Sequence, residues 1–206
     1  MRLIAFILAA LVVSAPASAQ WKEYGFANQG FGIAFPADPN IEEVPMYAAV
    51  PGKMVPATIY SLRHNNTMLK VTVADGRDAG LQEEAVVAHH VRQLQQGGRV
   101  TFDFPHRIYR IYGRQMSVER AAQRTLTQAV LFFANERLYL VESTRMPGGE
   151  DIDLIKFQQS LTFDRNVKNR TEQQVAAIRA ACTRGVAGND VPGNPAGLDD
   201  PRCGQN

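Results

Sequence analysis

Four histidines are the residues best suited to acid–base or metal chemistry in this sequence. His89 and His90 are adjacent, whereas His64 and His106 stand alone. Neighbouring residues of a helix point about 100° apart and cannot bind one metal ion together. Against the apolar stripe of the expected helix, His89 faces away from the core and His90 lies at its border. We predict a solvated helix face; the alternative is a metal-dependent or hydrolytic enzyme using His90, His106 and a carboxylate.

Other catalytic residue types are present without the spacing that their chemistry needs. None of the four serines after residue 20 lies in a Gly-x-Ser-x-Gly motif, and no glycine-rich phosphate-binding motif occurs. Four pairs of adjacent carboxylates stand in expected loops or helix starts, where they favour the helix dipole or contact water. We therefore predict no catalytic residue, no metal site and no cofactor.

Arginine is concentrated in the middle of the chain. Six arginines fall between residues 99 and 124, where the only acids are Asp103 and Glu119. On neighbouring strands, such side chains could form a basic face that holds an anionic group through bidentate contacts. The pattern favours a simpler interpretation, in which the arginines occupy the solvent side of an antiparallel sheet. The residues to test for ligand binding are Arg107, Tyr109, Arg110, Tyr112 and Arg114.

The beginning of the chain has the layout of a cleaved secretory signal. Arg2 precedes an apolar run at residues 3–13, and the small residues 17–19 form a cleavage site before Gln20. The run is shorter than the ~20 residues of a membrane-spanning helix, and an uncleaved anchor is the alternative. We expect cleavage after Ala19 and a periplasmic or secreted protein that does not span the membrane.

The charge balance indicates which partners to expect. Without Arg2, 21 basic and 20 acidic residues remain in the chain. Proteins that bind nucleic acid carry a clearly basic domain, so a nucleic-acid partner is not expected. We expect a protein or a small molecule of the cell envelope instead.

The two cysteines, Cys182 and Cys203, both lie near the end of the chain. In an oxidising compartment, an even number of cysteines without Cys-x-x-Cys spacing indicates a structural disulfide. A bridge that closes a loop of roughly 22 residues would stabilise the tail by about 3 kcal/mol. A redox-active pair is the less favoured alternative.

The elements that must position these side chains follow from periodicity and turn signals. Residues 30–35 are an expected strand with Phe31 and Phe35 on one face, ended by Pro36, which cannot donate to a sheet ladder. A hairpin is expected around Asn65-Asn66, with a two-residue loop and a solvated second face. Its cross-strand pairs are Leu62 with Leu69, Tyr60 with Val71 and Thr58 with Val73.

Further elements complete a mixed pattern. A second hairpin is expected from residues 125–133 and 138–144, helices at 81–96 and 151–161, and strands at 99–103 and 108–118. Residues 44–56, rich in Pro, Gly and Met, are an expected irregular edge or loop, and a helix begins at Thr171. Local hairpins interrupted by helices predict an α+β fold, an antiparallel sheet flanked by helices.

In this order, several of these segments resemble the PsbP-like family, the photosystem II extrinsic-subunit fold. The segments are WKEYGF running into GFGIAFPADP, then YGRQMSVE, ERLYLVES and FQQSLTF, all within residues 21–163. The resemblance is to an uncharacterised bacterial exported member, and it implies an antiparallel sheet between helices, an α/β/α sandwich. It also implies an accessory or binding role, and it carries no catalytic residue to this chain.

Three parts of the chain are therefore expected. Residues 1–19 are the signal peptide, residues 20–165 the PsbP-like domain, and residues 166–206 a tail of helix and loop with the disulfide. The expected function is that of an exported, non-enzymatic binding or accessory protein of the bacterial cell envelope.

Overall fold

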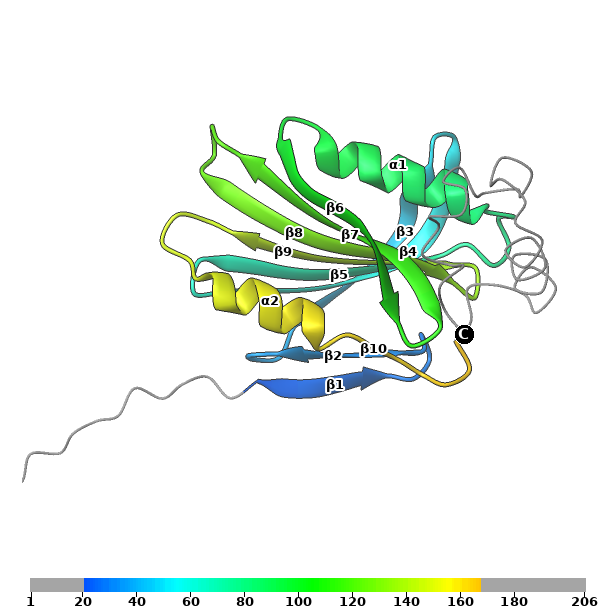
Figure 1. Ribbon diagram of the computed structural model, residues 1–206. Helices are drawn as coiled ribbons and strands as arrows, with labels where there is room; N and C mark the ends of the chain where they lie inside the picture. Colours follow the sequence, from blue (N-terminus) through cyan, green and yellow to red (C-terminus); the bar gives the residue numbers. More distant parts are fainter. Residues whose placement is uncertain (1–20, 168–206) are drawn as a thin grey trace, which may run out of the picture.

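The structure is a computed structural model that describes residues 21–167, in which ten strands and two helices follow one another (Figure 1). Helix α1 (Glu83–Gln95) lies between β5 and β6, and α2 (Asp151–Gln159) lies between β9 and β10. The strands are β1 (Lys22–Phe26), β2 (Phe31–Phe35), β3 (Asn40–Val50), β4 (Lys53–His64), β5 (Thr67–Asp75), β6 (Arg99–Ile108), β7 (Ile111–Arg120), β8 (Thr125–Ala134), β9 (Arg137–Arg145) and β10 (Thr162–Phe163).

Two antiparallel sheets contain these strands. The large sheet has the order β3-β4-β5-β9-β8-β7-β6, and the small sheet has the order β1-β2-β10. Both turn residues of the β4–β5 hairpin, Asn65 and Asn66, have positive φ, as have Asn135 and Glu136 between β8 and β9. Positive φ at both central residues defines a type I′ turn, whose twist matches that of the strands. The three predicted cross-strand pairs of the first hairpin are confirmed.

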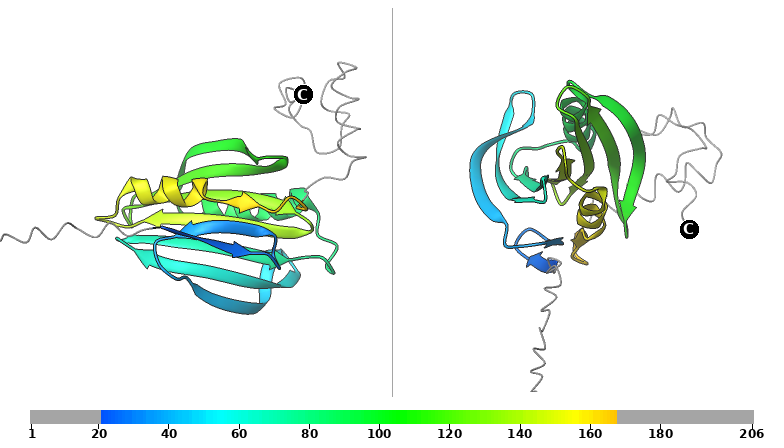
Figure 2. Two further views of the ribbon diagram at one scale, coloured as in Figure 1. Left: turned by 90° about the horizontal axis from the view of Figure 1, so that it is seen from below. Right: turned by 90° about the vertical axis from the view of Figure 1, so that its left-hand side faces the viewer.

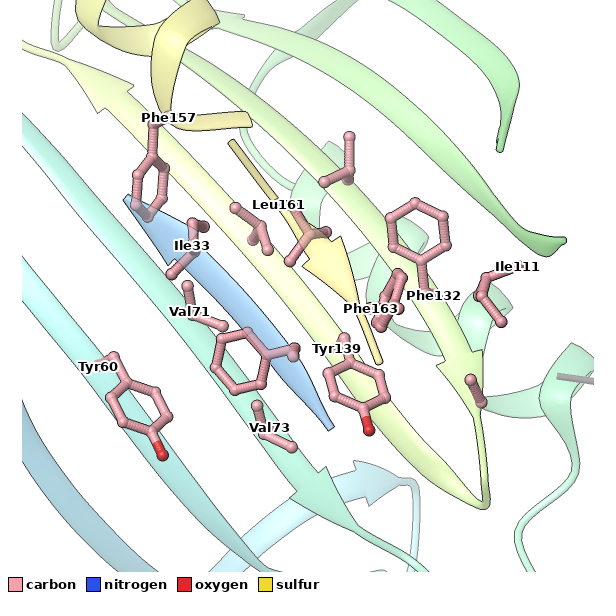
Figure 3. Packing of buried hydrophobic residues seen from close by; sticks show 14 of the residues in the cluster. Ile33, Tyr60, Val71, Val73, Ile111, Phe132, Tyr139, Phe157, Leu161 and Phe163 are labelled. Atoms are coloured by element: carbon pink, nitrogen blue, oxygen red, sulfur yellow. The ribbon is translucent and has the colours of Figure 1, made fainter. Parts of the chain in front are cut away.

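One face of the large sheet forms a hydrophobic cluster with α2 and the small sheet. Val71 of β5 and Tyr139 of β9 belong to this cluster, together with Ile33 of β2 and Phe157 of α2 (Figure 3). Phe157 is 0% exposed. Complete burial of such a side chain contributes about 1.5–3 kcal/mol of transfer free energy. The small sheet and α2 therefore cover this face together.

The opposite face forms a second cluster with α1. Strand residues alternate between faces, so Leu138, next to Tyr139, points to this opposite face. Ala74, an odd number of positions after Val71, does the same, and both join Val86 and Val91 of α1. The views in Figures 1 and 2 show α1 and α2 over different parts of the curved sheet. The expected solvated face of the first hairpin is wrong at this end, because Ala74 is 0% exposed within the α1 cluster.

Helix α1 begins at Glu83, two residues later than predicted, and ends before Gly97, whose φ is +69°. A carboxylate in the first turn and Arg92 in the last both favour the helix dipole. His90, predicted at the border of the core, is 1% exposed and belongs to the buried face with Val86. The buried face of α1 therefore includes His90, unlike the predicted one, because β3 also packs against this helix.

Strand β2 ends before Pro36, as predicted, and the chain then crosses to β3. Its neighbours β1 and β10, which were not predicted from the sequence, pair with opposite sides of β2. Both sides of Gly32 are paired, with Gly25 and with Thr162. Strand β2 is therefore the centre of the small sheet.

Prolines within strands account for two wrong boundaries, at residues 44–56 and 103. The expected strand at residues 99–103 continues through Pro105 to the end of β6, an edge strand on which a missing N–H can face away from the ladder. Residues 44–56, expected as an irregular edge or loop, form part of β3 and β4. Pro45 lies at a register shift of the β3–β4 pair, and Pro56 lies opposite that shift. The expected strand at residues 108–118 is wrong at its start for another reason, because Ile108 ends β6 and β7 begins at Ile111 after a turn.

The predicted fold class is confirmed at the level of an antiparallel sheet with helices packed against it. On the α2 side, the layer that covers the large sheet consists of α2 and the small sheet together, and not of helices alone. The predicted signal peptide, the helix from Thr171 and both cysteines lie outside the described residues.

Candidate functional site

A pocket with a volume of about 620 Å³ lies between α2 and the strands β6, β7 and β8. Figure 2 shows α2 alongside the β6–β7 pair. Small-molecule sites in proteins have volumes of roughly 300–1,000 Å³, so the size is that of a ligand site. The lining residues are His106, Arg107, Ile108, Tyr109, Gln115, Gln128, Val130, Ile155, Gln158, Gln159, Leu161 and Thr162.

Glutamine amides provide most of the polar groups of this pocket. Gln115 Nε2 donates a hydrogen bond to Gln158 Oε1 over 3.2 Å, which connects β7 with α2. Gln158 is 6% exposed, and its Nε2 has no hydrogen-bond partner within residues 21–167. A buried donor without a partner costs about 1–3 kcal/mol. The Gln158 amide is therefore placed to donate to an acceptor oxygen of a bound molecule.

His106 adds an imidazole to the same wall. Its ring packs against Phe132, with 5.8 Å between the ring centroids. Burial lowers the pKa of His106 below its ordinary value. The imidazole is consequently neutral at neutral pH, where one ring nitrogen donates and the other accepts a hydrogen bond.

Exposed apolar side chains lie at the pocket and on the neighbouring strand β6. Tyr109 is 75% exposed in the β6–β7 turn, where its φ is 53°, and Ile155 of α2 is 43% exposed. Phe104 is opposite Gln115 in the strand register and packs against Phe102, with 4.6 Å between ring centroids. Neighbouring exposed apolar groups of this kind mark binding surfaces more often than isolated ones do.

The charges around the pocket indicate the kind of molecule that fits it. Among its lining residues, Arg107 is the only one with a permanent charge, and none is a carboxylate. Divalent metal ions such as Ca²⁺ and Mg²⁺ prefer carboxylate oxygens as ligands. The arrangement is suited to hydrogen bonding with a neutral molecule that also has an apolar part.

The structure places the five predicted ligand-binding residues at three different locations. Arg107 and Tyr109 line the pocket. Arg110 is exposed in the turn after Tyr109. Tyr112 and Arg114 alternate with Gln115 along β7 and thus belong to the opposite face of the sheet.

Internal contacts account for three of the six clustered arginines. Arg114 forms a bidentate ion pair with Asp103, with distances of 2.5 and 2.7 Å, and this pair raises the pKa of Arg114. Arg99 pairs with Glu119 across the β6–β7 ladder. Arg120 donates to the main-chain carbonyl of Leu94 over 2.8 Å. These three side chains connect elements of the fold.

The histidines named for the alternative enzyme do not share a site. His90 stacks on Tyr47 in the α1 layer, with 5.7 Å between ring centroids, whereas His106 packs on the α2 side. His64 contacts Asn65 at the first hairpin, and His89 contacts Gln93 on α1. Within residues 21–167, no three His, Cys, Asp or Glu side chains lie close enough to hold a metal ion.

Neither α1 nor α2, the helices of the described residues, has the length and apolar composition needed to cross a bilayer. This finding concerns residues 21–167 alone.

Comparison with known proteins finds solved structures with a similar fold. The structure is similar to the solution structure of cyanobacterial PsbP (CyanoP) from Synechocystis sp. PCC 6803, with a TM-score of 0.44 and 11% sequence identity. The match covers 74% of this chain and 98% of that chain. No protein-family model and no curated protein matches this chain. At this identity the similarity concerns the fold alone.

Several pocket residues were not predicted from the sequence. Gln115 and Gln158 are 43 positions apart, and only the packing of α2 against the sheet brings them together. Glutamine is common on solvent-exposed surfaces, so neither its type nor its spacing indicated a site. The exposed Phe102 and Phe104, alternating on a strand next to His106, were the one available signal.

Proposed function

We propose that this protein is an exported, non-enzymatic accessory or binding protein of the bacterial cell envelope, and that it binds through the pocket between α2 and β6–β8. The observation that most directly supports this binding site is the buried Gln158 amide. Gln158 lines the pocket, and its Nε2 has no hydrogen-bond partner within residues 21–167. The exposed Tyr109 and Ile155 at the opening supply contact area for a small ligand or for a segment of a partner protein.

The proposal includes the organisation predicted from the sequence. Residues 1–19 would be removed as a signal peptide, residues 20–165 would act as a PsbP-like α/β/α sandwich, and Cys182 and Cys203 would form a disulfide in the tail. The mass of the protein recovered from the envelope of its natural host tests the cleavage site. A chain that begins at Gln20 supports export, and a chain that retains residues 1–19 contradicts it.

Site-specific photo-crosslinking tests the binding site. A benzophenone amino acid replaces Ile155 at the pocket opening in one variant and Glu84 on the exposed side of α1 in the other. After irradiation in the natural host, an adduct from position 155 that is absent from position 84 is expected. Gel electrophoresis detects a protein adduct, and intact mass detects a small ligand.

The pocket variant Gln115→Leu provides the matched test of specificity. It removes the amide that contacts Gln158 and should weaken the adduct from position 155. The absence of any adduct, or equal adducts from positions 155 and 84, would falsify the proposed site.

A further inference from the structure

We infer that the pocket between α2 and β6–β8 binds a neutral carbohydrate, an inference that rests on the proposed binding function. Hydroxyl groups both donate and accept hydrogen bonds, and the side-chain amide of glutamine does the same. Four glutamine side chains line this one pocket. Such a set matches a ligand with several hydroxyl groups at neighbouring positions.

The hydrogen-bonding groups are positioned before any ligand arrives. Gln158 Oε1 accepts from Gln115 Nε2 at 3.2 Å, which fixes the Gln158 amide while its Nε2 lacks a partner within residues 21–167. At 6% exposure, this side chain has almost no contact with solvent. A sugar hydroxyl or ring oxygen could accept the Nε2 proton, and the neutral His106 could donate or accept a further hydrogen bond.

Apolar side chains of the pocket could pack against the apolar face of a sugar ring. A pyranose ring has a face of C–H groups that packs against aromatic and aliphatic side chains. Tyr109 and Ile155 are exposed at the opening, and Val130 and Leu161 are buried in the pocket wall. The ligand would therefore contact amides along one edge and apolar groups along its face.

The lining charges and the strand edge disfavour two other kinds of ligand, a cation and an added strand. No carboxylate is among the lining residues, which disfavours a cationic ligand, and Arg107 is their only permanent charge. A partner strand added to the free edge of β6 would need an unbroken series of main-chain N–H groups. Pro105, next to His106, interrupts that series on β6. Side chains must therefore provide the recognition.

Titration of the purified protein with defined saccharides, followed by NMR of the side-chain amide groups, tests the inference. The probes are cellobiose and N,N′-diacetylchitobiose, with glucosamine and glucose 6-phosphate as charged comparators. Saturable shifts of the Gln115 and Gln158 amide signals are expected for a neutral disaccharide below about 10 mM, and weaker ones for the charged sugars.

Variants locate the site. Gln158→Leu keeps the side-chain volume and removes the amide, and Ile155→Ala removes the apolar contact from an exposed position. Each should raise the dissociation constant by about 3- to 10-fold, the effect of one hydrogen bond or apolar contact. The control Gln123→Leu, in the exposed β7–β8 turn, should leave the dissociation constant unchanged. If Gln158→Leu unfolds the protein, Ile155→Ala remains the deciding variant.

The outcomes separate this inference from the proposed function. No saturable shift with either neutral disaccharide would overturn the carbohydrate assignment, as would equal shifts with the charged sugars. An adduct from position 155 in the crosslinking experiment would then still support a binding site. If Gln123→Leu reduced the shifts as much as Ile155→Ala does, the sugar would bind elsewhere. This result would also overturn the inference.

Discussion

His90 is a histidine in the interior of the α1 layer. Its side chain is 1% exposed, and neither ring nitrogen has a partner with hydrogen-bond geometry within residues 21–167. Burial, together with the nearby His89, lowers the pKa of His90 to about 4, although the Ala49 main chain and the Gln93 side chain offset part of this effect. Lys70 of β5 also disfavours a second positive charge there. The native protein therefore holds His90 in its neutral form.

This burial predicts a loss of stability in acid. The ordinary pKa of histidine is 6.5, so the unfolded chain binds a proton at His90 that the folded chain excludes down to about pH 4. The free energy of unfolding should fall as the pH drops below 6.5 and level off below 4, with a contribution of at most about 3 kcal/mol. In His90→Leu, urea unfolding at pH 7.5 and pH 4.5 should show a smaller difference than in the native sequence.

The control for this prediction is Val86→Ala on the same buried face of α1. Val86 is 0% exposed, and its replacement removes apolar contacts without removing a titratable group, so stability should fall by a similar amount at both pH values. A His90→Leu variant that loses as much stability in acid as the native sequence would show that other groups cause the loss.

At the scale of the elements, the close approach of β7 and β8 behind the pocket depends on a glycine. A Cβ atom on Gly113 would lie 2.2 Å from the Leu131 main-chain oxygen and 2.4 Å from the Phe132 ring. Phe132 is 0% exposed and supports His106 of the pocket wall, so neither neighbour can move freely. The two strands thus fix the position of this wall.

We predict that Gly113→Ala destabilises the protein by about 1–3 kcal/mol, the usual cost of overpacking a rigid interior. Urea unfolding at neutral pH measures the change. Gly25→Ala in β1 is the matched control, because a Cβ atom there meets nothing within 4 Å. Equal effects of the two substitutions would indicate that the backbone propensity of glycine, and not the contact with Leu131, determines the outcome.

Local rules predicted the elements of this fold better than their limits or their assembly. Asn65-Asn66 specified a two-residue turn, and the register of β4 and β5 followed from it. Pro105 was misleading, because the sequence does not reveal that β6 is an edge strand on which proline is tolerated. The contact of Gln115 with Gln158 depends on how α2 packs, a tertiary arrangement without a local signal.

At the scale of the whole molecule, the two faces of the large sheet differ in what they contribute. The α1 face holds the buried His90 and the ion pair of Arg114 with Asp103, both of which concern the fold. The α2 face holds the pocket, its amides and the exposed rings of Phe102 and Phe104. Substitutions at the pocket opening should therefore affect binding more than stability, because the core lies behind it.

The proposed disulfide lies in the tail, apart from the described core. The buried members of both described hydrophobic clusters lie within residues 31–167, and Trp21, Tyr24 and Phe26 pack against one of the clusters. Cys182 and Cys203 lie beyond these residues, so the proposed disulfide should constrain the tail and leave the core intact. Cys182→Ser should keep one cooperative thermal transition for the domain and make the tail easier for a protease to cut. The double variant Cys182→Ser/Cys203→Ser should behave identically, since either substitution breaks the same bridge. Loss of the whole transition in both variants would contradict this prediction and would mean that the domain depends on the bridged tail.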